Sequence, residues 1–339
     1  MDLSGLIPFF SPTFDWVQVE VTTHCNAACL YCPRTVYQET WQDHHLTLDI
    51  FRKLQPVFTR TRLLHLQGWG EPFLNPEFFE MVALAKVAGC KVGTTTNGML
   101  LDRERIARLV DSGIDTVAFS LSGTDEENDR IRKGTRLTKV LEAIQALGRR
   151  KEELKAVKPA IHLAYMLFRS GMEGFGRLPS LLQGLGVTQV VVSTLDFIPS
   201  SDLQGEALIP ATEGEYDDLR SRLDAVVAEG GRYGMNMHYH LVSPLHRRKV
   251  CTENVQRAIC ISSDGAVTPC VFTDLQISQA SYLLGNESRP YQRMAFGNIH
   301  EESLMEIWRG KAYIAFRRSF EKGDLAAVCR GCPKLLGRG

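Results

Sequence analysis

Three cysteines near the N-terminus have the type and spacing of metal ligands. Cys25, Cys29 and Cys32 lie within eight residues in a C-x3-C-x2-C pattern. Thiolates are soft ligands that select zinc or iron–sulfur clusters, and three of them leave one iron of a [4Fe-4S] cube without a protein ligand. A structural zinc site would need a fourth ligand, and His24 is expected on the opposite face of the strand from Cys25. The trio therefore predicts a [4Fe-4S] cluster with one open iron.

A second group of cysteines lies in the last third of the chain. Cys329 and Cys332 form a C-x2-C pair, and Cys251 and Cys270 flank a glycine in a C-x13-G-x4-C pattern. Four thiolates complete a closed centre. A four-cysteine zinc ribbon is the alternative to an iron–sulfur cluster here, because C-x2-C pairs alone do not distinguish the two metals.

Strands that alternate with helices must position these thiols. Six strand-like runs follow Pro12, each with an amphipathic helical stretch after it. This alternation predicts an α/β fold with a parallel sheet and right-handed crossovers, and six units suit a partial (βα)6 TIM-like barrel better than a full eight. Functional loops then lie at the carboxyl ends of the strands. The predicted strands are Trp16 to Thr22, Leu63 to Gln67, Lys91 to Thr95, Thr116 to Ser120, Ala160 to Met166 and Gln189 to Thr194.

A change of pattern divides the chain in two. Gly230-Gly231 predicts a break after the helix expected from Thr212 to Ala228. We therefore expect a barrel over residues 1–230, followed by a small α+β cluster-binding domain over residues 231–339. Within the second domain, Ser263-Asp264-Gly265 predicts the turn of a hairpin. The helices predicted there are Ser303–Trp308 and Lys311–Phe320.

Composition narrows the class of protein. The 339 residues are 44% hydrophobic and 23% charged, as in globular proteins, and 39 basic residues balance 39 acidic ones. A net charge of zero gives no overall field toward nucleic acid or an anionic membrane. The longest apolar stretches are strand-sized, and the N-terminus lacks a basic region ahead of an apolar patch. We expect a cytoplasmic protein with reduced thiols and with no nucleic-acid or membrane partner.

The first cysteine trio resembles the cluster loop of the radical S-adenosylmethionine (radical SAM) superfamily. Gly68-Trp69-Gly70-Glu71-Pro72 is similar to the GGEP motif of that family, from which it departs at Trp69. Thr95-Thr96-Asn97-Gly98, Ser120-Leu121-Ser122 and Arg132 follow in the same order as further SAM-contacting positions of the family. The resemblance covers roughly residues 16 to 200.

The resemblance implies that SAM chelates the open iron and is cleaved by one electron to methionine and a 5′-deoxyadenosyl radical, which abstracts hydrogen from a substrate. Glu71 would accept hydrogen bonds from the SAM ammonium group, and Arg132 would pair with the SAM carboxylate. Tyr31 would cover the adenine, and Ser120 or Asn97 would bond the ribose. A reductant such as flavodoxin or ferredoxin is then an expected partner. The predicted SAM-binding residues are Tyr31, Gly68, Gly70, Glu71, Pro72, Thr96, Asn97, Ser120, Ser122 and Arg132.

The second group of cysteines, with Phe296-Gly297-Asn298-Ile299 between its halves, resembles the SPASM and twitch extensions of radical SAM enzymes. A full SPASM domain binds two auxiliary clusters through additional cysteines, and none lies between Cys270 and Cys329. We therefore predict one auxiliary [4Fe-4S] cluster. Cys260 is expected in the apolar core, with the alternative that it replaces Cys251 as a ligand. The predicted auxiliary ligands are Cys251, Cys270, Cys329 and Cys332.

An auxiliary cluster near the radical could accept the electron that remains after hydrogen abstraction, or bind substrate. We therefore predict a maturase that oxidises a peptide, a protein or a metal-enzyme cofactor. The stretch Gln189 to Pro199 resembles radical SAM maturases associated with tungsten oxidoreductases, and Asp196 within it is a candidate catalytic acid or base. Two alternatives are a small-molecule alcohol dehydrogenase of the twitch type and a non-catalytic metal-binding or electron-transfer protein.

Overall fold

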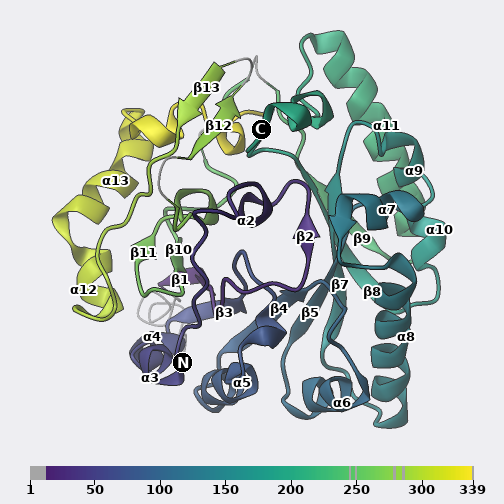
Figure 1. Cartoon of the computed structure of the whole chain (residues 1–339), viewed down its shortest axis with the longest axis horizontal. Coiled ribbons are helices and arrows are strands. Elements are labelled where there is room, and N and C mark those ends of the chain that lie inside the picture. The colour runs from purple at the N-terminus through teal and green to yellow at the C-terminus, as the bar shows by residue number, and fades with distance from the viewer. Residues whose placement is uncertain (1–12, 244–245, 249, 278–279, 285–286, 338–339) are drawn as a thin grey trace, which may run out of the picture.

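The computed structural model describes residues 13–243, 246–248, 250–277, 280–284 and 287–337. At its centre is one sheet of nine strands in the order β11-β10-β1-β3-β4-β5-β7-β8-β9 (Figure 1). Neighbouring strands are parallel except for β10 and β11. The strands of this sheet are β1 (Phe14–Val19), β3 (Thr61–Leu66), β4 (Lys91–Thr96), β5 (Thr116–Leu121), β7 (Ala160–Leu167), β8 (Val187–Thr194), β9 (Asn236–Tyr239), β10 (Ala258–Ile261) and β11 (Val267–Thr268).

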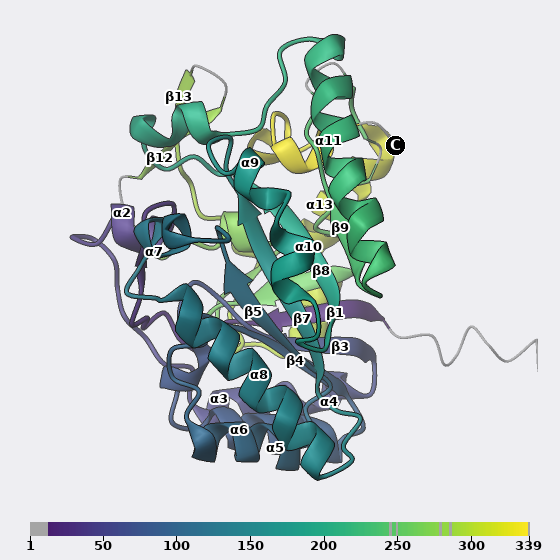
Figure 2. The same ribbon diagram turned by 90° about the vertical axis from the view of Figure 1, so that its right-hand side faces the viewer.

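Helices cover the outside of the curved sheet, and Figure 2 shows α8, α10 and α11 in front of its strands. The six strands from β1 to β8 follow one another in chain order with helices between them, so the predicted partial (βα)6 barrel is confirmed. The helices of this part are α2 (Pro33–Val36), α3 (Leu48–Arg52), α4 (Gln55–Phe58), α5 (Phe78–Val87), α6 (Arg103–Asp111), α7 (Glu126–Ile131), α8 (Leu137–Glu153), α9 (Met172–Phe175), α10 (Leu178–Leu182) and α11 (Glu213–Arg232).

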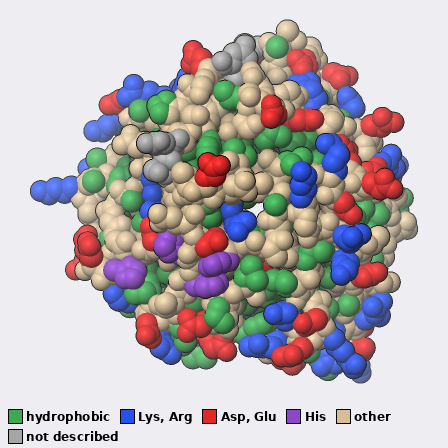
Figure 3. All heavy atoms as spheres, viewed as in Figure 1, with side chains coloured by type: hydrophobic (Ala, Val, Ile, Leu, Met, Phe, Trp, Pro, Cys, Tyr) green, Lys and Arg blue, Asp and Glu red, His purple; other side chains and the backbone are tan. Residues whose placement is uncertain are grey.

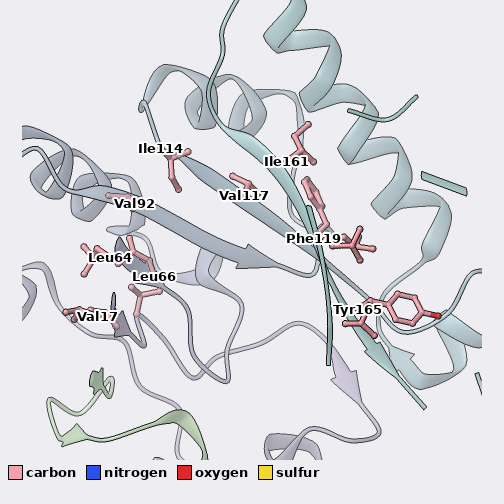
Figure 4. Packing of buried hydrophobic residues seen from close by; sticks show 14 of the residues in the cluster. Val17, Leu64, Leu66, Val92, Ile114, Val117, Phe119, Ile161 and Tyr165 are labelled. Carbon is pink, nitrogen blue, oxygen red and sulfur yellow. The ribbon is translucent and has the colours of Figure 1, made fainter. Parts of the chain in front are cut away.

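Alternation along the strands separates a packed outer face from a polar inner face. On β5, Val117 and Phe119 are fully buried, while Ser120 between Phe119 and Leu121 lines a cavity inside the barrel. Figure 4 shows the buried side chains of neighbouring strands gathered into one apolar layer. Because the side chains of a strand point alternately to its two faces, the strands that fix this core also turn their polar residues toward the barrel interior.

The predicted break at Gly230-Gly231 is wrong, because α11 runs through both glycines to Arg232. A Cβ at Gly230 would come within 2.2 Å of Met237 Sδ, so a glycine here allows α11 to pack closely on β9. β9 adds to the sheet beside β8, and β10 adds beside β1. The sheet therefore runs across residue 230, and the division into two domains at that point stays a prediction.

The C-terminal part packs beside the β1 edge of the barrel (Figure 1). The predicted hairpin is formed by β10 and β11, with Gly265 in its turn at a φ of +82°. No helix in the described ranges is both long and apolar enough to cross a membrane. The remaining elements are β2 (Ala28–Cys29), β6 (Arg132–Lys133), β12 (Ser281–Leu284), β13 (Glu287–Pro290), α12 (Leu304–Arg309) and α13 (Lys311–Lys322).

Candidate active site

The loop with the first three cysteines starts where β1 ends and crosses the mouth of the barrel. Its short strand β2 pairs antiparallel with β6, which places Cys29 opposite Arg132. Cys32 is the N-cap residue of α2, and the Ala27 amide donates to Cys25 Sγ at 3.4 Å. Figure 3 looks onto this mouth, which is hollowed at its centre and surrounded by charged side chains of both signs.

The thiols of Cys25, Cys29 and Cys32 line one cavity of about 210 Å³. Burial and the neighbouring Cys29 raise the pKa of Cys32 to about 12, and burial also raises the pKa of Cys25. Thiols held in this way are poorly solvated, and a bound metal takes the place of their protons. Three convergent soft donors beside open space fit a [4Fe-4S] cluster with three protein ligands.

Glu71 faces the same cavity and is only 2% exposed. Its Oε1 accepts a hydrogen bond from Thr96 Oγ1 at 2.7 Å, and its Oε2 accepts one from the Asn97 amide at 2.7 Å. Burial raises the pKa of Glu71 to about 7, although these hydrogen bonds oppose the rise. Since a carboxylate has about four lone-pair positions, Glu71 keeps acceptor capacity for an ammonium group in the cavity.

Arg132 and Tyr31 also line the cavity. Arg132 is 7% exposed, and its Nη1 donates to the Tyr31 hydroxyl. Its Nε is buried and has no hydrogen-bond partner among the described residues. A buried donor without a partner costs free energy, so the guanidinium has a donor to offer to an anionic ligand. This arrangement fits the carboxylate of SAM.

The loop after β3 brings Glu71 to the thiols. A Cβ at Gly70 would lie 2.3 Å from the Thr22 carbonyl oxygen, so only glycine lets the two loops pass this closely. The Glu71 amide then donates to the His24 carbonyl at 2.8 Å. Trp69, at the departure from the family motif, donates its indole Nε1–H to the Asp274 carbonyl at 3.1 Å.

Most of the predicted SAM-binding residues meet at this cavity. Pro72 and Ser122 do not line it; Pro72 is buried behind the loop, and the Ser122 hydroxyl lies 3.5 Å from that of Tyr31. The predicted residues that line the cavity are Tyr31, Gly68, Gly70, Glu71, Thr96, Asn97, Ser120 and Arg132. Lining residues outside that list are Ala27, Arg34, Gln67, Trp69 and Thr95, although Trp69 and Thr95 lie within the motifs that carry the family resemblance.

The missed residues differ in how far the sequence could have revealed them. Gln67 and Thr95 were placed at the ends of predicted strands, where polar side chains on the inner face are the available signal. Arg34 follows the cluster loop, and its Nε donates to the Thr23 carbonyl at 3.1 Å. No periodic pattern in the sequence indicates that contact.

The four cysteines of the second group line a separate cavity in the C-terminal part of the chain. Burial and nearby thiols raise the pKa values of Cys329 and Cys332 to about 12 each. Four soft donors around one cavity fit a closed iron–sulfur centre. The lining cysteines are Cys251, Cys270, Cys329 and Cys332.

Cys260 stands apart from that set. It lies on β10 opposite Thr268 of β11, is 6% exposed, and is not among the residues that line the second cavity. Burial raises its pKa well above the usual range, and nearby Cys270 adds to the rise. Cys260 is therefore a buried core residue, and the choice of Cys251 as the ligand stays a prediction.

Asp196 faces the second cavity and not the first. Its Oδ2 lies 2.9 Å from Lys334 Nζ, and its Oδ1 accepts from Thr194 Oγ1 at 3.0 Å. Lys334 also pairs with Glu253 at 3.3 Å. Asp196 follows β8 at the carboxyl end of the sheet, as expected, and the contact with Lys334 holds its carboxylate toward the cysteines of the second group. Its role as an acid or base stays a prediction.

Comparison with known proteins gives two matches to protein families. The model of the radical SAM superfamily matches residues 19–157, and that of SPASM, an iron–sulfur cluster-binding domain, matches residues 251–333. The two matched segments contain the first and the second group of cysteines, respectively. The four predicted auxiliary ligands all fall within the second segment.

Two relatives match nearly the whole chain. The tungsten-containing aldehyde ferredoxin oxidoreductase cofactor-modifying protein of Pyrococcus furiosus is 27% identical over 323 residues, which cover 94% of this chain and 86% of the relative. A PqqA peptide cyclase of Granulibacter bethesdensis is 26% identical over 333 residues, which cover 93% of this chain and 78% of the relative.

Solved structures share the fold at low sequence identity. Streptococcus suis SuiB bound to S-adenosylmethionine has a TM-score of 0.64 at 14% identity, covering 91% of this chain and 68% of SuiB. The protein anSMEcpe with bound AdoMet has a TM-score of 0.65 at 17% identity, covering 95% of this chain and 88% of anSMEcpe.

Proposed function

We infer that this chain, which belongs to the radical SAM superfamily and carries a SPASM extension, is a maturase that oxidises its substrate through a radical reaction. The observation that carries the proposal is the shared cavity of the Cys25 trio, Glu71 and Arg132. Soft ligands for iron and charged partners for an amino acid lie there side by side. A non-catalytic electron carrier would have no use for Glu71 and Arg132 at that place.

Each wall of the first cavity has a part in the proposal. Cys25, Cys29 and Cys32 hold a [4Fe-4S] cluster, which supplies the electron that cleaves SAM to methionine and the 5′-deoxyadenosyl radical. Glu71 accepts from the ammonium group of SAM, and Arg132 donates to its carboxylate. The surrounding burial excludes water, which strengthens both interactions and protects a reactive species from side reactions.

The second cavity holds the auxiliary [4Fe-4S] cluster in this proposal. Aromatic side chains pack around it, with Phe197 stacked on Tyr282 at a centroid distance of 5.3 Å. Lys334 places a cation in the same wall, over the Phe272 ring. A buried redox centre of this kind can accept the electron that remains on the substrate after hydrogen abstraction, which makes a net oxidation the expected outcome.

We propose that the substrate is a peptide, a protein or a metal-enzyme cofactor. The names of the relatives support this range, because one is a cofactor-modifying protein and another is a peptide cyclase. The proposal includes a small redox protein such as flavodoxin or ferredoxin as the electron donor, since the first cluster must be reduced by one electron before SAM can be cleaved. It also places the protein in the cytoplasm, where thiols stay reduced for cluster assembly.

Anaerobic reconstitution with iron and sulfide, followed by SAM and dithionite, tests the proposed chemistry. We expect 5′-deoxyadenosine from the wild-type protein and none above background from Cys25→Ala. Cys90→Ala is the matched control, because Cys90 is a buried thiol between α5 and β4 that lines neither cavity. A wild-type protein that binds iron at the trio but forms no 5′-deoxyadenosine would refute the proposal.

A further inference from the structure

A buried carboxylate joins the SAM cavity to the C-terminal part of the chain. Glu20 directly follows β1 and is 2% exposed. Its Oε1 accepts from the Trp69 amide at 2.9 Å, beside the SAM cavity. Its Oε2 accepts from the Ser263 amide at 3.2 Å and from Gln276 Nε2 at 3.0 Å, both beyond β10. One side chain therefore holds two parts of the molecule that lie far apart in sequence.

The Glu20 side chain packs closely against Gly68, which lines the SAM cavity. A Cβ at Gly68 would lie 2.2 Å from Glu20 Cγ, so the glycine leaves room for the carboxylate stem. Burial raises the pKa of Glu20, and its many hydrogen-bond donors act against that rise. A buried carboxylate is stable only when its lone pairs are satisfied, and here donors from both sides satisfy them.

Trp69 makes a second connection across the same boundary. Its indole Nε1 donates to the Asp274 carbonyl at 3.1 Å. The Asp274 side chain is 4% exposed and accepts from Arg293 Nη2 at 2.8 Å, and Arg293 Nη1 pairs with Asp264 at 2.6 Å. The ion pair between Asp274 and the partly exposed Arg293 therefore fixes the residue whose carbonyl accepts from the indole.

Asp274 belongs to the segment that carries an auxiliary ligand. The Thr273 amide donates to the Cys270 carbonyl at 3.1 Å, and Thr273 Oγ1 donates to the same oxygen at 2.8 Å. The Asp274 amide donates to the Val271 carbonyl at 3.2 Å. A short hydrogen-bonded turn thus connects Cys270 to Asp274, whose carbonyl accepts from Trp69. A displacement of Cys270 would therefore move Trp69, which lines the SAM cavity.

We propose that Glu20 and Trp69 are positioning residues that couple SAM binding to occupancy of the auxiliary cluster site. Iron bound at Cys270 fixes the turn up to Asp274, which holds Trp69, while Glu20 holds the loop that presents Glu71. Linkage then makes the effect reciprocal, so that SAM also favours the cluster-bound form of the auxiliary site. This inference rests on the proposed assignment of the first cavity to SAM.

Trp69→Phe tests the connection with little change of shape, because it removes the indole N–H and keeps an aromatic ring. With both clusters reconstituted, we expect the Kd for SAM to rise about threefold to tenfold, as the loss of one buried hydrogen bond implies, with the iron content unchanged. Trp41→Phe is the matched control, since Trp41 Nε1 has no hydrogen-bond partner among the described residues. Equal SAM affinity of Trp69→Phe and Trp41→Phe would contradict the role of Trp69.

A double-mutant cycle separates coupling from a structural effect. Loss of the auxiliary cluster through Cys329→Ala with Cys332→Ala should raise the Kd for SAM about threefold or more in the wild-type background. The same change should raise the Kd by a clearly smaller factor in the Trp69→Phe background, because the connection through the indole is already broken and only that through Glu20 remains. Equal increases in both backgrounds would overturn the coupling.

Glu20→Gln provides a second route to the same test if the double cysteine variant is insoluble. The amide retains the shape but turns a donor toward groups that are themselves donors, so the SAM affinity should fall at least as far as in Trp69→Phe. Unchanged affinity would remove Glu20 from the proposal.

A wild-type protein that binds no SAM would refute the proposed function. A wild-type protein that binds SAM, with variants that bind it equally well, would refute only the coupling.

Discussion

Burial and hydrogen bonding act in opposite directions on the pKa of Glu71. Burial raises its pKa to about 7, and the donors Thr96 and Asn97 keep the charged form accessible near neutral pH. The carboxylate thus gains most when a cation enters the cavity, because a new positive partner favours the ionised form further. This property suits a residue that accepts the ammonium group of a ligand.

The first prediction concerns the pH dependence of SAM binding. Below pH 7 Glu71 in the free protein is mostly protonated and must lose its proton before it can pair with an ammonium group. Glu71→Gln should therefore weaken SAM binding about tenfold or more at pH 8, where a charge-assisted hydrogen bond of roughly 1.5–3 kcal/mol is lost. The ratio of the variant Kd to the wild-type Kd, measured on reconstituted protein, should shrink toward pH 6. A ratio that stays constant from pH 6 to 8 would contradict the role of the carboxylate.

The second prediction concerns Arg132, whose Nε is buried without a partner in the described part of the chain. Arg132→Ala removes the donor proposed for the SAM carboxylate, so the Kd for SAM should rise about tenfold or more while iron content stays the same. Arg130→Ala is the matched control, because Arg130 is exposed and pairs with Glu127 at 3.1 Å. Binding that falls equally in both variants would point to a structural effect of the segment.

The order and spacing of the motifs predicted most residues that line the first cavity. They did not predict the side chains that support the two cavities from distant parts of the chain. Cys25, Glu71 and Arg132 fall in ordered motifs, so the sequence alone brought them together. Glu20 and Lys334 act through contacts with residues more than 40 positions away, and no local pattern indicates such a pairing. The contact of Asp196 with Lys334 could not be predicted for the same reason.

At the scale of elements, strand periodicity was the dependable signal. β7 alternates half-buried and buried residues along its whole length, and the predicted strand Ala160 to Met166 lies within it. The glycine pair Gly230-Gly231 was a misleading signal, because it predicted a break where α11 is continuous. A glycine in a helix costs stability, and its presence at position 230 reflects the approach of Met237, which only the folded structure reveals.

The third prediction compares these two glycines. Gly231→Ala places its Cβ where no atom lies within 4 Å, so it should stabilise the protein by about 0.5–1 kcal/mol through helix propensity. Gly230→Ala brings the same gain in propensity but forces Met237 aside, at a cost of about 1–3 kcal/mol. Thermal melting at one scan rate should therefore rank Gly230→Ala below Gly231→Ala. The reverse order would show that α11 and β9 do not pack this closely.

At the scale of the whole molecule, one sheet connects the two cysteine groups. β10 pairs in parallel with β1 through register partners such as Val17 and Ile259, so the C-terminal part extends the barrel and does not hang from it by a linker. The turn at Ser263-Asp264-Gly265 predicted the hairpin, but nothing in the sequence predicted the pairing of β10 with β1. Hydrophobic periodicity within a strand does not indicate which distant strand lies beside it. The auxiliary site is therefore held at a fixed place relative to the SAM site.

The fourth prediction concerns metal content. Two cubes of four irons give about eight irons per chain, and changing Cys25, Cys29 and Cys32 together to Ala should leave about four. Cys251→Ala should reduce the auxiliary iron, whereas Cys260→Ala should keep about eight, because Cys260 does not line the second cavity. Iron and zinc analysis of anaerobically prepared protein checks each value. Zinc in place of iron, or iron loss in Cys260→Ala, would contradict the ligand assignment.

The fifth prediction separates the tasks of the two clusters. In Cys329→Ala with Cys332→Ala the Cys25 trio and its cavity keep all their residues, so the variant should still form 5′-deoxyadenosine with dithionite at saturating SAM. It should form no oxidised substrate, because the electron left after hydrogen abstraction has lost its acceptor. Mass spectrometry of the substrate and chromatography of 5′-deoxyadenosine measure the two steps separately.

The result depends on whether the C-terminal part folds without its metal, since closed four-cysteine sites often contribute directly to folding. The parallel pairing of β10 with β1 favours a folded variant, because Cys329 and Cys332 lie on neither strand. Circular dichroism and the iron count of the trio check this before activity is compared. A folded variant that cleaves SAM and still yields the normal product would show that the auxiliary cluster serves structure alone, and the electron would then have to leave the substrate by another route.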